Sequence, residues 1–183
     1  DWLLSVSTIP SGSESSLPVL GDLAKIVESF CSRLDAWFNL APPIKRLAFG
    51  CVGSQQVAGH KEGYELLGKY LPGVTVDPEG SSEFLYQINR HRPSTVIDGL
   101  IINRLTKWSV ARTQSVSMQL VLTPDAQGSV VSGVPMGEFI AVRSELDINT
   151  SQKWAKPFAK RQLASILGEL AGLGLEIAAK GDI

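Results

Sequence analysis

The residues with the clearest chemical potential form a basic cluster in the middle of the chain. Arg90, His91 and Arg92 follow one another, and the next segment carries Arg104, Lys107 and Trp108. If the two segments are neighbouring strands, their cations share a surface and the indole is available for stacking on a base. We therefore take these six residues as a candidate anion-binding patch for phosphate groups or an acidic partner.

The same cations have a second interpretation. Arg104 and Lys107 could pair with Glu145 and Asp147 on the solvent-facing side of the same sheet. Cross-strand pairs of this kind stabilise a surface only slightly, because solvent screens them. The pattern therefore also fits a salt-bridged surface with no ligand.

Two further groups could take part in acid and base chemistry. Glu145 and Asp147 are two residues apart, so an extended strand would place them on one face at roughly 7 Å. Arg143 on that face argues against a bound cation. His60 and Glu62 open an expected helix, where capping alone explains their presence. A solvated strand face and a helix cap are the favoured interpretations.

Several chemistries are excluded by missing motifs. The segment Gly50-Cys51-Val52-Gly53 lacks the lysine and the third glycine of a phosphate-binding loop. No Gly-x-Ser-x-Gly motif is present, and the histidines and cysteines show no local metal-ligand spacing. We expect no metal, no cofactor and two reduced thiols, Cys31 and Cys51.

Composition sets the size and class of the protein. The 183 residues are 44% hydrophobic and 19% charged, with 17 basic and 18 acidic side chains and a net charge of −1. These values predict one globular domain over residues 1–183. No apolar run approaches the roughly 20 residues of a membrane span, so we expect a soluble chain with no membrane partner. The balanced charge argues against a protein built wholly around nucleic acid.

Hydrophobic periodicity predicts the elements that must position these residues. Apolar residues at helical spacing predict three amphipathic helices, and alternation predicts strands elsewhere. The predicted helices are 21–38, 60–71 and 157–179, and the strands are 2–8, 44–52, 84–89, 99–110, 115–123 and 138–148. Turns are expected at 124–128 and 132–133, and residues 9–20 are expected to form a flexible Ser/Pro-rich loop. This order predicts an α+β fold, with a mostly antiparallel sheet packed against two or three amphipathic helices.

Short motifs spread over the chain resemble a sporadically distributed family of prokaryotic proteins without characterised function. They are Pro43-Ile44-Lys45-Arg46-Leu47, Gln87-Ile88-Asn89-Arg90, Asn103-Arg104-Leu105 with Lys107-Trp108, and Leu146-Asp147-Ile148-Asn149. The chain departs from the family pattern at Gly50-Cys51-Val52 and at Asn149. The resemblance implies a cytoplasmic helix-and-sheet domain from bacteria or archaea, and no particular activity.

We therefore predict a non-enzymatic binding or assembly protein that acts through protein–protein contacts, with a homo-oligomer or a protein partner. Its interaction surface would be the exposed sheet face or the C-terminal helix, where Gly168, Gly172 and Gly174 allow close approach. The alternative is nucleic-acid or polyanion binding through the basic patch. An enzyme of unknown class is the third possibility.

Overall fold

The computed structural model of the chain describes residues 19–121 and 130–182, and between 113 and 137 it describes only the paired backbone. The predicted strand 2–8 and residues 9–18 of the predicted loop lie outside the described residues. The elements are α1 (Leu23–Leu40), β1 (Ala48–Val57), α2 (His60–Tyr70), β2 (Leu85–Pro93), β3 (Ile101–Val121), β4 (Val130–Thr150) and α3 (Lys160–Lys180).

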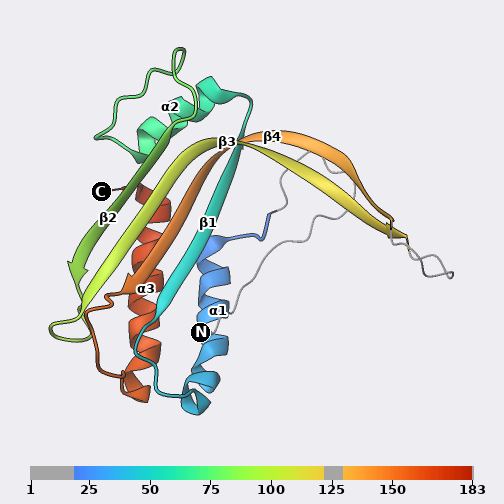
Figure 1. The fold of residues 1–183 in the computed structure, drawn as a ribbon. Coiled ribbons are helices and arrows are strands. Elements are labelled where there is room, and N and C mark those ends of the chain that lie inside the picture. Colours follow the sequence, from blue (N-terminus) through green and yellow to red (C-terminus); the bar gives the residue numbers. More distant parts are fainter. Residues whose placement is uncertain (1–18, 122–129, 183) are drawn as a thin grey trace.

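The strands form one four-stranded antiparallel sheet in the order β1-β4-β3-β2. Helices α1 and α3 lie side by side behind this sheet, and α2 covers one end of it (Figure 1). The sheet face turned toward the viewer in Figure 1 carries no helix. The expected α+β architecture, an antiparallel sheet packed against helices, is confirmed.

The core lies between the sheet and α3. Side chains alternate along a strand, and the even-numbered residues from 102 to 110 of β3 and from 140 to 150 of β4 face the helices. Ile102 and Ile148 are fully buried there, and α3 contributes Ile166 and Leu170, which are also fully buried. Burying such a side chain stabilises a fold by about 2 kcal/mol. The predicted alternation of β4 is confirmed, because its odd-numbered charged residues lie on the opposite face.

Strands β3 and β4 are longer than the sequence predicts. Each has 21 residues, and the turn expected at 132–133 is part of β4. Beyond the Leu85↔Ser109 and Val57↔Ile140 pairs, the pairing described for β3 and β4 is with each other. This two-stranded ribbon bends away from the sheet in Figure 1. Backbone pairing does not depend on side chains, so a ladder can continue through turn-prone residues. The apolar face predicted for 115–123 lies outside the described side chains.

Helix α1 is less buried than its apolar stripe predicts. Only Val27 and Phe38 are buried among its residues. The helix packs on α3 and makes little contact with the strands, and Ile26 and Phe30 are half-buried. Among the described strands the sheet ends at β1, and none of them lies under the outer side of α1 (Figure 1).

Helix α3 is the central helix of the fold. By length and composition it is the one helix of the described chain that could cross a membrane. Core helices often meet that criterion too, and α3 buries eight residues against the rest of the fold. An added Cβ on Gly174 would lie 2.6 Å from the Phe49 ring, whereas Gly168 and Gly172 face open space. Gly174 therefore serves internal packing, and the other two glycines remain available to a partner.

Candidate binding surfaces

The structure divides the six residues of the predicted anion patch between the two faces of the sheet. Arg90 and Arg92 on β2, with Arg104 and Trp108 on β3, share the helix side. His91 and Lys107 belong to the open side, because adjacent residues of a strand point to opposite faces. The six side chains are therefore not brought together, and binding of an anion by all of them stays a prediction.

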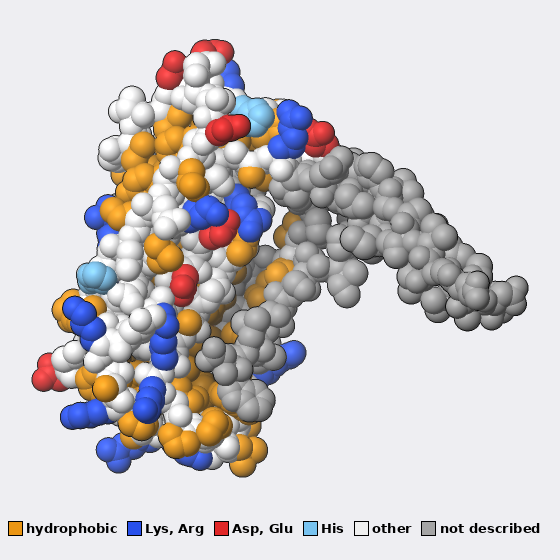
Figure 2. All heavy atoms as spheres, viewed as in Figure 1, with side chains coloured by type: hydrophobic (Ala, Val, Ile, Leu, Met, Phe, Trp, Pro, Cys, Tyr) orange, Lys and Arg blue, Asp and Glu red, His pale blue; other side chains and the backbone are white. Residues whose placement is uncertain are grey.

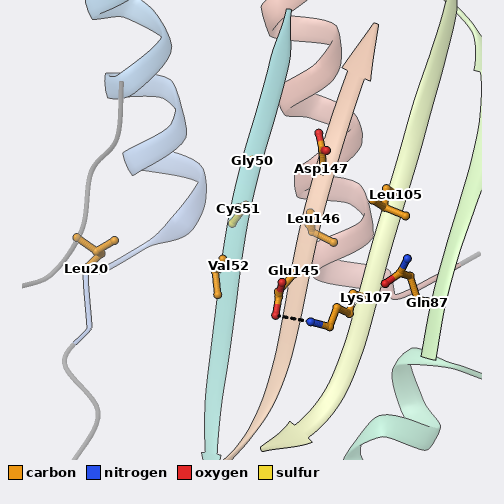
Figure 3. A pocket seen from close by; sticks show the side chains of 10 residues that line it. All are labelled: Leu20, Gly50, Cys51, Val52, Gln87, Leu105, Lys107, Glu145, Leu146 and Asp147. Carbon is orange, nitrogen blue, oxygen red and sulfur yellow. Dashed lines mark hydrogen bonds and ion pairs between the residues drawn. The ribbon is translucent and has the colours of Figure 1, made fainter. Parts of the chain in front are cut away.

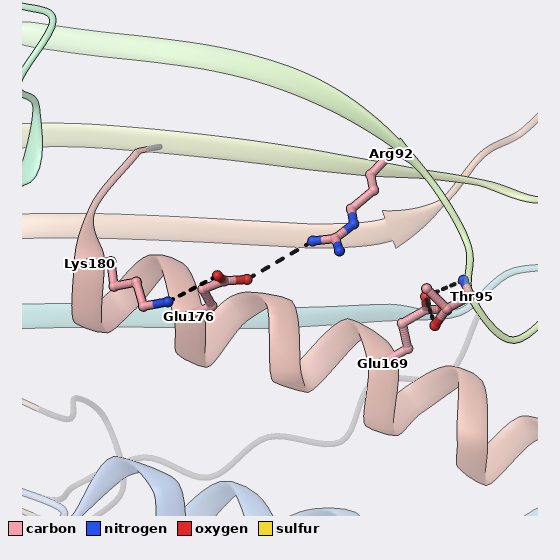
Figure 4. A network of polar contacts seen from close by, with 5 residues as sticks. All are labelled: Arg92, Thr95, Glu169, Glu176 and Lys180. Carbon is pink, nitrogen blue, oxygen red and sulfur yellow. Dashed lines mark hydrogen bonds and ion pairs between the residues drawn. The ribbon is translucent and has the colours of Figure 1, made fainter.

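The arginines of β2 hold the end of α3. Arg90 donates two hydrogen bonds to Asp182, from Nε at 3.1 Å and from Nη2 at 3.2 Å. The Asp182 carboxylate is only 4% exposed and also accepts a 2.8 Å bond from the Tyr86 hydroxyl. These hydrogen bonds and the charge of Asp182 raise the pKa of Arg90. Arg92 lies 4.0 Å from Glu176, which also pairs with Lys180 (Figure 4).

Trp108 and Arg104, the two remaining patch residues on the helix side, each have side-chain atoms buried in the fold. Trp108 is 2% exposed and stacks on Tyr70, with 5.2 Å between the ring centroids. The Nε of Arg104 is buried and has no hydrogen-bond partner among the described residues. Trp108 is therefore unavailable for stacking on a base, and Arg104 is the one arginine of the predicted patch that the described contacts leave unpaired.

The open face of the sheet contains a hollow of about 760 Å³. Lys107, Glu145 and Asp147 line it together with small and apolar side chains of β1 and β3 (Figure 3). Figure 2 shows acidic and basic side chains interspersed on the upper part of this face. The hollow is therefore of mixed charge and does not resemble a site for a polyanion.

Glu145 is fixed within the hollow by two cations. Its Oε1 accepts a 3.0 Å bond from Arg143 Nε and a 3.2 Å bond from Lys107 Nζ. The hydrogen bond from Arg143, with further help from Lys107, lowers the pKa of Glu145 against the effect of burial. The Lys107–Glu145 pair of the second interpretation is confirmed, whereas Arg104 lies on the face opposite Asp147.

Three distant segments meet at Asn149, which is 5% exposed. Its Oδ1 accepts bonds from Asn103 Nδ2 at 2.9 Å and from Arg46 Nη2 at 3.3 Å. Its own amide nitrogen donates to Asp147 Oδ1 at 2.9 Å. This network ties the start of β1 to β3 and β4 and orients Arg46.

The described groups do not assemble an acid–base pair. His60 stacks on Tyr64 within α2 and does not line the hollow that contains Glu145 and Asp147. A lowered pKa keeps Glu145 ionised, which makes it a poor proton donor. Cys51 lines the hollow as a free thiol whose pKa burial raises. Within 19–121 and 130–182, no three His, Cys, Asp or Glu side chains gather as metal ligands.

Sequence reasoning missed a contrast between the two edges of the sheet. Edge strand β2 carries Arg90, Arg92 and Pro93, which discourage pairing with another chain. Edge strand β1, with the sequence AFGCVGSQQV, carries no charge and no proline. The sequence shows that residues 48–57 carry no charge, but only the topology shows that this segment is an edge strand.

Exposed hydrophobic side chains gather at the same edge. The described residues include seven exposed large hydrophobics, and five of them lie on β1, on α1 or just before α1. They are Val19, Leu20, Leu23, Leu40 and Val52. Leu20 lies on the outer side of β1 and lines the hollow with Val52 (Figure 3). We call β1 together with α1 and its lead-in residues 19–22 the β1 edge surface.

Comparisons with protein-family models, curated proteins and solved structures found no match to this chain. The family resemblance of its short motifs stays a prediction.

Proposed function

We propose that this protein is a non-enzymatic assembly protein whose partner is a second copy of itself, joined through the β1 edge surface. The observation that carries the proposal is the composition of edge strand β1, which lacks the charges and the proline of β2. An edge strand without such residues is a template for another strand.

Self-pairing of β1 is compatible with its sequence. A two-fold axis through Gly53 would join two antiparallel copies of β1 and place Val52 opposite Ser54 on the open side. On the helix side the same axis would place Phe49 opposite Val57, an apolar pair. No charged side chain of β1 would meet its own copy.

The area available suits a stable dimer. The paired strands would extend about 30 Å, and the sheet and helix layers together are about 20 Å deep. The contact therefore covers about 600 Å² on each copy, or about 1,200 Å² in total, at the lower end of stable interfaces. Ile26 and Phe30 of α1 are half-buried apolar side chains within the same surface.

A pair of lysine variants tests this surface. Val52 is 58% exposed and Ser54 is exposed, so V52K/S54K places like charges across the proposed axis without disturbing the core. The matched control is L85K/Q87K on β2, where Leu85 is 57% exposed and Gln87 is exposed. Sedimentation equilibrium should give twice 19.7 kDa for the wild type and the control, and 19.7 kDa for V52K/S54K.

Two results would overturn the proposal. A wild-type mass of one protomer at the highest attainable concentration would remove self-association. A dimer that persists unchanged in V52K/S54K would place the contact elsewhere. Circular dichroism of each variant checks that the charges have not unfolded the monomer.

The other two functions have less support. The predicted polyanion patch has Arg90 and Arg92 engaged with acidic residues of the α3 end, and Trp108 is buried. For an enzyme, the carboxylates of the hollow lack a nearby described histidine, and Glu145 is held ionised.

A further inference from the structure

Basic side chains gather at the end of the molecule where α1 ends and α3 begins. Two loops, 41–47 and 151–159, run side by side there. Leu47 N donates to Thr150 Oγ1 at 3.0 Å, and Phe158 N donates to Ile44 O at 2.8 Å. The cations between these contact points, and the first residues of α3, are therefore held close together.

We call these cations the basic end. All of them are exposed, and none belongs to an ion pair within the described part of the chain. They are Lys45, Arg46, Lys153, Lys156, Lys160 and Arg161. By contrast, seven other Lys and Arg side chains form ion pairs. Figure 2 shows Lys and Arg gathered at this lower end, although the whole chain carries a net charge of −1.

The first turn of α3 departs from the usual charge pattern. Acidic residues stabilise a helix N-terminus and cations destabilise it, because the peptide dipoles leave positive charge there. Helix α3 begins with Lys160 and Arg161 and has no acidic residue in its first turn. Lys160 Nζ donates a 2.6 Å hydrogen bond to Asn39 O at the end of α1, and this bond explains the presence of a lysine at the start of α3. Arg161 has no described side-chain contact and adds positive charge to an already positive end.

We propose that the basic end binds the phosphate backbone of duplex nucleic acid without regard to sequence. A duplex presents a dense line of phosphates, and Lys and Arg side chains bind it chiefly by releasing its counterions. The aromatic residues of this end are not free to read bases, because Trp154 stacks on the buried Phe158 at 6.0 Å. Positioning contacts to phosphates without base contacts carry no sequence information.

An anionic membrane is the competing ligand. Surface anchoring in a bilayer requires an apolar face beside the cations. The exposed large hydrophobics at this end, Leu40 and Ile101, lie on different elements, and the cations lie on loops and at a helix end instead of along an amphipathic helix. The geometry therefore favours the duplex.

The salt dependence of binding tests the proposal quantitatively. Fluorescence anisotropy of a labelled 20-base-pair duplex (about two turns) should show affinity falling about a thousandfold between 50 and 200 mM salt if all six cations contact phosphates. K45A/K153A/K156A removes three of the six cations, so its affinity should fall only about 40-fold over the same salt range. The reason is that the slope of log affinity against log salt decreases in magnitude by about one for each lost phosphate contact. These three residues are exposed, and their side chains make no described contact that holds the fold.

A charge-matched control separates the basic end from net charge. K61A/K69A/K180A removes three exposed cations that lie on α2 and at the end of α3, outside both the basic end and the β1 edge surface. It should keep the wild-type salt slope. Equal weakening in both triple variants, or no duplex binding at low salt, would overturn the proposal. Salt-sensitive binding to phosphatidylserine vesicles with no binding to the duplex would also overturn it, in favour of a membrane. None of these outcomes depends on self-association through β1, and sedimentation of each variant reports that separately.

Discussion

Replacing the glycines of α3 by alanine should produce opposite effects on stability at neighbouring positions. An alanine at Gly168 or Gly172 would meet no atom within 4 Å. Each of these substitutions should therefore stabilise the protein by up to about 1 kcal/mol, the difference in helix propensity between glycine and alanine. An alanine at Gly174 gains the same propensity but places Cβ 2.6 Å from Phe49 Cε1 and 2.9 Å from Cδ1.

The Phe49 ring has little room to yield. It is 6% exposed and packs between the sheet and α3, and Ile148 lies 3.7 Å from the same added Cβ. Overpacking of this kind costs about 1–3 kcal/mol, so G174A should be net destabilised by about 1 kcal/mol. The difference between G174A and G172A is then about 2 kcal/mol.

Urea denaturation at one fixed protein concentration measures this difference, because any self-association makes stability depend on concentration. With a slope of about 2 kcal/mol per molar urea, the midpoints of G172A and G174A should differ by about 1 M. Equal midpoints would refute the reasoning, since they would mean that Phe49 does not pack against Gly174.

Two further predictions concern the contacts of α3. Arg90→Ala should destabilise the protein by about 1.5–3 kcal/mol in urea denaturation, because it leaves the buried Asp182 carboxylate without its charged donor. Arg92→Ala should change the stability by less than about 0.5 kcal/mol. Equal effects of the two substitutions would contradict this ranking. Burial alone would raise the pKa of Glu169, but hydrogen bonds from Ser94 and its neighbour lower it below the ordinary value. The stability that Glu169 contributes is therefore present above the unfolded-state pKa and lost as the pH falls through the folded-state pKa. Urea denaturation at pH 7 and pH 3 should show that the wild type loses more stability over this range than E169Q does. Equal losses in the two proteins would contradict a stabilising role for the ionised Glu169 carboxylate.

The two proposed surfaces lie on different parts of the molecule and can be tested separately. The β1 edge surface runs along one side of the sheet, whereas the basic end lies on the loops that precede β1 and follow β4 and on the first residues of α3. The lysine substitutions at Val52 and Ser54 leave every cation of the basic end in place. Loss of the dimer with unchanged duplex affinity would show that each chain binds independently.

Local patterns in the sequence determined the fold class and the faces of the longest elements. The alternation around Glu145 and the stripe of α3 each depend only on the pitch of one element, so they could be predicted without knowing its neighbours. The predicted break between 110 and 115 was wrong, because pairing with β4 carries β3 through that segment as one strand.

The candidate surfaces depended on relations between distant residues. Arg90 and Lys107 were predicted to share a face, but the register of β2 against β3 places them on opposite sides, and that register is not encoded in either segment alone.

The sequence by itself determined an α+β chain with amphipathic helices and a strand with one polar face, because these features repeat with the period of a single helix or strand. Only the tertiary structure decided that the uncharged segment 48–57 is an edge strand of the described sheet, since an edge is defined by strand order. It also decided that Lys45 and Arg46 join Lys153 and Lys156, because the Leu47–Thr150 contact closes a separation of 103 residues.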